Sequence, residues 1–258
     1  MNNHEIDYKL FGEEMQCVEV ELDPQEAVIA EPGSFMMMTD GIQMETLFGD
    51  GNESGFMNKL FSAGKRLLTG ENLFMTVYTN NSNQKRQVTF AAPYAGKIIT
   101  MNLSNLGNKI ICQKDSFLCA AKGVSVGIEF QKKLGTGLFG GEGFIMQKLE
   151  GDGLAFVHSG GHVIEKQLQA GEVLKVDTGC IVAFTSDVHY DIQFVGGVKN
   201  TLFGGEGVFY ASLKGPGKVW IQTLPISRLA GRILSYGKGS RKEEGSILGG
   251  LGNLIDGD

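Results

Sequence analysis

Apolar and polar residues alternate along most of this chain, the pattern of half-buried β-strands. Val18, Val20 and Leu22, for example, are separated by Glu19 and Glu21. Successive side chains of a strand point to opposite faces, so such a segment gathers its apolar residues on one face of a sheet. Strands are expected at residues 18–23, 74–79, 87–92, 97–102, 153–158, 173–177, 190–194 and 218–223. Their short spacing is typical of β-sandwiches and barrels.

Two segments near the C-terminus depart from this alternation. Residues 225–234 carry apolar side chains at helical spacing, and Pro225 stands at the start, where proline is well tolerated. We therefore expect a short C-terminal helix. Residues 237–258 are rich in glycine, with a basic patch followed by an apolar end, which predicts a flexible tail outside a single β domain of residues 1–236.

A glycine-rich hexapeptide, Leu-Phe-Gly-Gly-Glu-Gly, occurs at residues 138–143 and again at 202–207, with a weaker copy at 67–72. Such self-similarity indicates a fold built from repeated units. Each copy follows a strand, a turn and two further strands, and precedes another strand. The sequence thus predicts an all-β fold of three pseudo-repeated sheet modules in one sandwich- or barrel-like domain. The equivalent repeat positions are Gly70, Glu71, Gly141, Glu142, Gly205 and Glu206.

The three equivalent carboxylates, Glu71, Glu142 and Glu206, allow two interpretations. They converge on a cation near a pseudo-symmetry axis, or each accepts hydrogen bonds from its own glycine-rich bend. We favour the second, because glycines at a packed corner permit positive φ and close backbone approach.

His158, His162 and Glu165 invite comparison with a metal site of the cupin type, and His189 is a further candidate. Ser159–Gly161 between the histidines indicates a turn, so we expect the pair on opposite strands of a hairpin. Surface or structurally satisfied histidines are the favoured interpretation, and no metal or cofactor is assigned.

Other motifs exclude common activities. Residues 135–140 match GxGxxG, but a strand-like segment at 144–149 follows instead of a helix, which argues against dinucleotide binding. The chain contains no GxSxG and no HExxH, so no catalytic residue is assigned. Met36–Met38 form a run suited to adaptable packing, either in the core or at a subunit interface.

Charge and cysteine content suggest a compartment and exclude one class of partner. The net charge of −6 gives no general attraction to nucleic acid. Residues 1–54 are mainly acidic and 55–134 mainly basic, which favours complementary surfaces within or between subunits over a phosphate site. The four cysteines form no CxxC pair, and three of them, Cys17, Cys112 and Cys180, lie in apolar alternating stretches, as buried free thiols of a reducing compartment do. With no signal peptide and no membrane-spanning run, we expect a cytoplasmic protein.

Four motifs together carry a family resemblance: Glu31–Ser34 before the methionine run, the repeated hexapeptide, Phe156–Gly161, and Gln222–Pro225. The chain resembles the bacterial branch of the altered-inheritance-of-mitochondria protein twenty-four family. The resemblance implies a fold similar to the tryptophan-RNA-binding attenuation protein, often as a homotrimer. Mitochondrial relatives are implicated in organising inner-membrane complexes, whereas bacterial members have no agreed activity. Neither catalytic residues nor RNA binding carry over.

The sequence therefore predicts a non-enzymatic oligomeric scaffold or binding protein. Its expected partners are further copies of itself, as a homotrimer, and an unidentified protein. The alternative is a small-ligand or metal-binding protein, hydrolases included, that uses the histidine pair or the symmetric glutamates. A third hypothesis is peripheral membrane contact through the tail.

Overall fold

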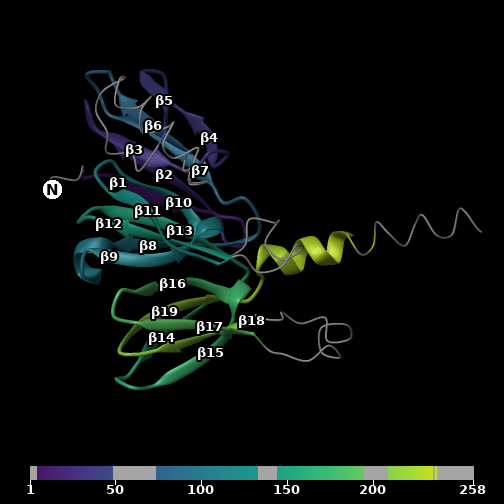
Figure 1. Ribbon diagram of the computed structural model, residues 1–258. Helices are drawn as coiled ribbons and strands as arrows, with labels where there is room; N and C mark the ends of the chain where they lie inside the picture. Colours follow the sequence, from purple (N-terminus) through teal and green to yellow (C-terminus); the bar gives the residue numbers. More distant parts are fainter. Residues whose placement is uncertain (1–4, 49–73, 133–143, 195–208, 235, 237–258) are drawn as a thin grey trace, which may run out of the picture.

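The computed structural model describes residues 5–48, 74–132, 144–194, 209–234 and 236 (Figure 1). The first strands are β1 (Asp7–Phe11), β2 (Cys17–Leu22), β3 (Ala27–Ala30), β4 (Phe35–Met38), β5 (Ile42–Phe48), β6 (Phe74–Asn80), β7 (Arg86–Ala91) and β8 (Gly96–Asn102). The middle strands are β9 (Lys109–Gln113), β10 (Phe117–Ala121), β11 (Ser125–Lys132), β12 (Phe144–Glu150), β13 (Leu154–Gly160) and β14 (Val163–Leu168). The last strands are β15 (Val173–Asp177), β16 (Ile181–Thr185), β17 (His189–Phe194), β18 (Phe209–Lys214) and β19 (Gly217–Gln222).

Short 3-10 helices and one α-helix complete the described part of the chain. The 3-10 helices are η1 (Leu103–Leu106), η2 (Lys114–Ser116) and η4 (Thr178–Cys180). Residues 226–234 form the predicted C-terminal helix, which projects to one side of the sheets in Figure 1. The Pro225 carbonyl accepts hydrogen bonds from Arg228 N and Leu229 N, so the helix begins directly after this proline.

The strands repeat as three modules: β3–β8, β9–β14 and β15–β19. In each module the first strand leads through a turn or a 3-10 helix to the second and third strands. The segments that follow the third strands, 49–73, 133–143 and 195–208, lie outside the described residues. The fourth and fifth strands then complete the module. The predicted all-β fold is confirmed, and the described strands form open sheets without a closed barrel.

Four antiparallel sheets result, named here sheets 1 to 4 along the chain. Sheet 1 has the strand order β1-β2-β7-β4, sheet 2 β5-β6-β3-β10-β13-β8, sheet 3 β11-β12-β9-β16-β19-β14, and sheet 4 β15-β18-β17. Neighbouring modules share the two middle sheets, since β10 and β13 of the second module insert between β3 and β8 of the first. The outer sheets, 1 and 4, are smaller because each has strands of only one module, whereas sheets 2 and 3 combine strands of two.

Three hydrophobic cores separate the four sheets. Sheets 1 and 2 enclose Phe90 and Phe156, sheets 2 and 3 enclose Met75 and Trp220, and sheets 3 and 4 enclose Phe184. Sheets 2 and 3 are therefore covered on both faces. This explains why β10 and β16 are buried along their whole length and read as continuous apolar runs instead of alternating ones.

The expected hairpin between His158 and His162 is wrong. β13 pairs with β8 and β10 in sheet 2, whereas β14 pairs with β19 in sheet 3. The chain turns at Gly161, which has φ +66°, and crosses from one sheet to the next instead of folding back. A turn signal in the sequence marks a change of direction but does not specify which strand becomes the neighbour.

Candidate functional site

His158 is a buried structural residue. Its side chain is 1% exposed, and Nε2 lies 3.0 Å from the carbonyl oxygen of Tyr94. The imidazole ring of His158 also meets the phenol ring of Tyr94 edge to face, with the ring centroids 4.5 Å apart. Because a carbonyl only accepts, Nε2 carries the proton, and the bare Nδ1 is buried without a partner. This ring fixes the segment before β8 against the end of β13.

The other two members of the expected metal set follow the turn at Gly161, after which the chain enters sheet 3. His162 and Glu165 are exposed, and Glu165 accepts a hydrogen bond from Trp220 Nε1 at 2.9 Å and pairs with Lys218 Nζ at 2.7 Å. His189 is exposed on β17 of sheet 4. Among the described residues no group of three His, Cys, Asp or Glu side chains is placed to hold a metal ion.

His158 gives the protein a specific acid sensitivity. Burial lowers the pKa of this imidazole to about 4 from an ordinary value of 6.5, so the unfolded chain binds the proton more readily. The free energy of unfolding should therefore fall by about 2 kcal/mol as the pH drops from 7 to 4.5. Urea unfolding at several pH values measures this loss.

Replacing His158 by glutamine preserves a donor for the Tyr94 carbonyl but removes the titration. We expect His158→Gln to be less sensitive to acid by that same amount, and His162→Gln, which replaces an exposed histidine, is the matched control. Identical profiles for His158→Gln and wild type would contradict the assignment.

The six repeat positions Gly70, Glu71, Gly141, Glu142, Gly205 and Glu206 all lie outside the described residues. Their two interpretations, a shared cation site or local backbone bonding, stay predictions. The tail of residues 237–258 also lies outside.

A surface cavity of about 530 Å³ lies where the β3–β4 turn meets η2 and the C-terminal helix. Glu31, Tyr94, Lys114 and Ile226 line it. Burial raises the pKa of the Glu31 carboxyl to about 7, partly offset by the charge of Lys114. Near neutral pH this group is thus able to donate or accept a hydrogen bond. The motif that starts at Glu31 carries part of the family resemblance, but no pattern in the sequence indicates a cavity beside it.

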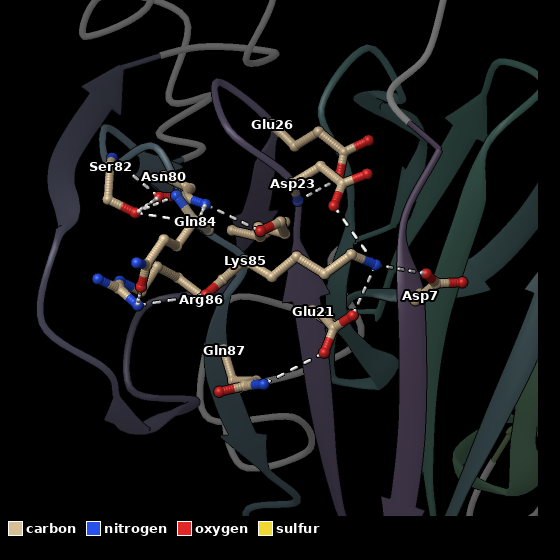
Figure 2. A network of polar contacts seen from close by, with 11 residues as sticks. Asp7, Glu21, Asp23, Glu26, Asn80, Ser82, Gln84, Lys85, Arg86 and Gln87 are labelled. Carbon is tan, nitrogen blue, oxygen red and sulfur yellow. Dashed lines mark hydrogen bonds and ion pairs between the residues drawn. The ribbon is translucent and has the colours of Figure 1, made fainter.

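An ion-pair cluster joins the acidic N-terminal part of the chain to Lys85 in the connection between β6 and β7 (Figure 2). Lys85 Nζ lies 2.8 Å from Glu21, 3.4 Å from Asp23 and 3.7 Å from Asp7. Hydrogen bonds to Glu21 and Asp23 raise the pKa of Lys85 above its ordinary value, and the hydrogen bond from Lys85 lowers the pKa of Glu21. Complementary charged surfaces therefore do meet within the subunit. Lys85 is half-exposed, so the cluster orients the β6–β7 connection more than it stabilises the fold.

The edge strand β4 presents a row of exposed apolar side chains. Phe35, Met36, Met37 and Met38 are 40%, 54%, 51% and 39% exposed. The Phe35 ring stacks on Tyr78, with centroids 5.6 Å apart, while the methionines remain accessible. Core filling by the methionine run is therefore wrong. A contiguous apolar row on an unpaired sheet edge is a feature of interaction sites.

All four cysteines are free thiols. Cys112 and Cys119 are buried, as predicted, whereas Cys17 and Cys180 are partly exposed. Burial raises the pKa of Cys112 to about 12 and that of Cys119 well above its ordinary value, which suppresses the reactive thiolate. Within the described residues, no helix has the length and apolar character needed to span a bilayer.

Taken together, the structure defines an all-β protein of three interlocked modules with an apolar sheet edge. The sequence profile of the family described as mitochondrial biogenesis AIM24 matches residues 8–224, and the chain belongs to this family. It is 27% identical over 221 residues to an uncharacterized protein of Streptococcus pyogenes serotype M6, M6_Spy0233, covering 85% of this chain and 86% of that protein.

A crystal structure shows the same fold. Protein SPYM3_0169 from Streptococcus pyogenes superposes with a TM-score of 0.71 at 23% sequence identity, covering 90% of this chain and 100% of the other. At this identity the likeness concerns the fold alone.

Proposed function

We propose that this protein is a non-enzymatic scaffold that assembles with copies of itself, as a homotrimer. The observation that carries the proposal is the row of exposed apolar side chains along the β4 edge. The trimeric order is what the family resemblance implies, and it requires each subunit to offer a surface to its neighbours.

The energetics of the β4 row support self-assembly. Full burial of a methionine or phenylalanine side chain contributes about 1.5–3 kcal/mol, and the four side chains of this row each retain a large exposed fraction. Covering them removes apolar area from water while the unpaired strand edge gains backbone hydrogen bonds. Three adjacent methionines are also flexible enough to fit an opposing surface.

Sedimentation of the purified full-length chain tests the proposal. We expect a mass three times the 27.8 kDa of the monomer at micromolar concentration. Met36→Asp, which places a charge in the row, should raise the dissociation constant at least about 100-fold, since burying an unpaired carboxylate costs several kcal/mol.

Met44→Asp is the matched control, because Met44 lies on β5 with the same 54% exposure as Met36 but outside the row. This variant should assemble like wild type. A monomeric wild type, or equal dissociation of both variants, would refute self-assembly through this edge.

The proposal places the protein in the cytoplasm, with support from four free thiols that fit a reducing compartment. A further protein partner and membrane contact through residues 237–258 stay predictions. We do not favour the metal-binding alternative, because His158 and Glu165 already have structural partners.

A further inference from the structure

The contact between successive modules is built twice within this chain. In each case the first strand of one module pairs antiparallel with the second strand of the next: β3 with β10, and β9 with β16. At the first junction Ala120 lies opposite Ile29, and at the second Phe184 lies opposite Ile111. The two junctions therefore follow one construction rule.

A register shift common to the three modules shows which residues of their second strands are equivalent. The second strand of every module slips by one residue against the fifth strand of the same module. The slip lies between Phe35 and Met37 in β4, between Phe117 and Cys119 in β10, and between Ile181 and Ala183 in β16. Met38 is thus the equivalent of Ala120 and Phe184.

The first strands are aligned in the same way. Each of β9 and β15 runs directly into a 3-10 helix, η2 and η4 respectively. Counting back from these helices, Lys175 of β15 occupies the place of Ile111 in β9. The same place in β3 belongs to Ile29, since Ile29 and Ile111 lie opposite equivalent residues.

The two ends of the chain each hold one half of this junction. β4 is the last strand of sheet 1, and β15 is the first strand of sheet 4, so neither has a neighbour on that side among the strands of the described residues. Met36 is 54% exposed, whereas its equivalents Leu118 and Val182 are at most 1% exposed. Val173 at the start of β15 is 51% exposed.

We infer that β4 of one copy pairs antiparallel with β15 of a second copy, with Met38 opposite Lys175 and Met37 opposite Val176. This inference rests on the proposed self-assembly and specifies the partner strand and its register. Sheet 4 of one copy and sheet 1 of the next then form a single sheet in the order β17-β18-β15-β4-β7-β2-β1. Its first six strands reproduce the arrangement of sheets 2 and 3.

The joined sheet also accounts for the ends of the chain. In sheets 2 and 3, the strand after the fifth strand of a module, β8 or β14, pairs with the fifth strand of the next module. After β19 the chain forms the C-terminal helix instead. In the joined sheet, a strand after β19 would lie beside β7, the fifth strand of the first module of the next copy. That position is already occupied by β2, which pairs with β7. The Lys175 ammonium lies over the Tyr210 ring, 5.3 Å from its centroid, on its own sheet.

Cysteine cross-linking between two different variants tests the register. Met38→Cys and Lys175→Cys each place one thiol at an exposed position, and the full-length variants are mixed, dissociated at high dilution, reassembled and oxidised. We expect a disulfide-linked dimer from the mixture at least tenfold more abundant than from either variant alone. Peptide mass mapping identifies the linked positions apart from the native cysteines.

Met38→Cys mixed with Val173→Cys is the matched control. Two residues along a strand amount to nearly 7 Å, which places these Cα atoms beyond the reach of a disulfide. We expect at most a background level of cross-link from this pair.

The outcomes separate the inference from the proposed function. Efficient 38–175 linkage supports both. A stable oligomer with no 38–175 linkage, or with linkage between two copies of position 38, overturns this interface and leaves self-assembly standing. A monomeric wild type, together with no 38–175 linkage between the cysteine variants, overturns both.

Discussion

The Gly160→Ala variant is expected to lose at least about 4 kcal/mol of unfolding free energy, or to fail to fold. Gly160 ends β13 opposite Gly96 of β8. A Cβ atom at this position would lie 2.0 Å from the carbonyl oxygen of Leu224 and 2.7 Å from the Tyr94 ring. Ordinary contacts are longer than 3.4 Å, so the backbone itself would have to move.

That movement is opposed by hydrogen bonds on both sides. Gly160 N donates to Gln222 Oε1 at 2.7 Å, and Leu224 N donates to the Gly160 carbonyl at 3.1 Å. Gln222 Nε2 in turn donates to the Gly179 carbonyl at 2.8 Å. Displacing residue 160 therefore disturbs the junction of sheets 2 and 3 together with η4.

Denaturant unfolding followed by circular dichroism measures the loss. Gly231→Ala is the control, because a Cβ at this helical position meets nothing within 4 Å. Alanine is the better helix former, so this variant should gain about 0.5–1 kcal/mol. A Gly160→Ala variant as stable as wild type would show that the junction adapts.

The second large effect is expected for Asn80→Leu, at about 3–4 kcal/mol of lost unfolding free energy. Asn80 is fully buried at the end of β6 (Figure 2). Its Nδ2 donates to the carbonyls of Leu22 at 2.9 Å and Gln84 at 2.7 Å. Its Oδ1 accepts from the Ser82 amide at 3.0 Å and from the Ser82 hydroxyl at 2.8 Å.

Leucine has a similar shape but satisfies none of these groups. The buried Leu22 carbonyl and the turn amide of Ser82 would lose their partners, and the β6–β7 connection would lose one of its links to β2. Asn81→Leu, an adjacent and exposed position, should change the stability by less than about 0.5 kcal/mol. Thermal unfolding of both variants provides the comparison, and similar midpoints would argue against the network.

Local pattern was sufficient to predict the fold class and much of the module structure. Residues 173–177 were predicted as a strand and are β15, and the helix predicted at 225–234 begins one residue later. These elements were accessible because alternation and helical spacing depend on residues close together in the chain. The repeated hexapeptide likewise indicated three modules, although the copies themselves lie outside the described residues.

Which strands pair with one another could not be predicted from local pattern in this way. The second strands of the three modules are similar apolar runs: Phe35–Met38, Phe117–Ala121 and Ile181–Thr185. Only Phe35–Met38 is exposed. The difference depends on whether a module precedes the run, since that module supplies the neighbouring first strand. The hairpin expected between His158 and His162 was wrong for the same reason, because β13 and β14 pair with strands from distant parts of the chain.

In the proposed assembly each copy offers the β4 edge to one neighbour and the β15 edge to the other. A subunit with an intact β15 and a damaged β4 still binds one neighbour, but no further copy attaches to it at the damaged edge. In a cell that makes both forms, such a subunit would prevent the proposed trimer from closing and would leave intact subunits in incomplete assemblies. Substitutions in β4 would therefore behave genetically as dominant, whereas a loss of folding would be recessive.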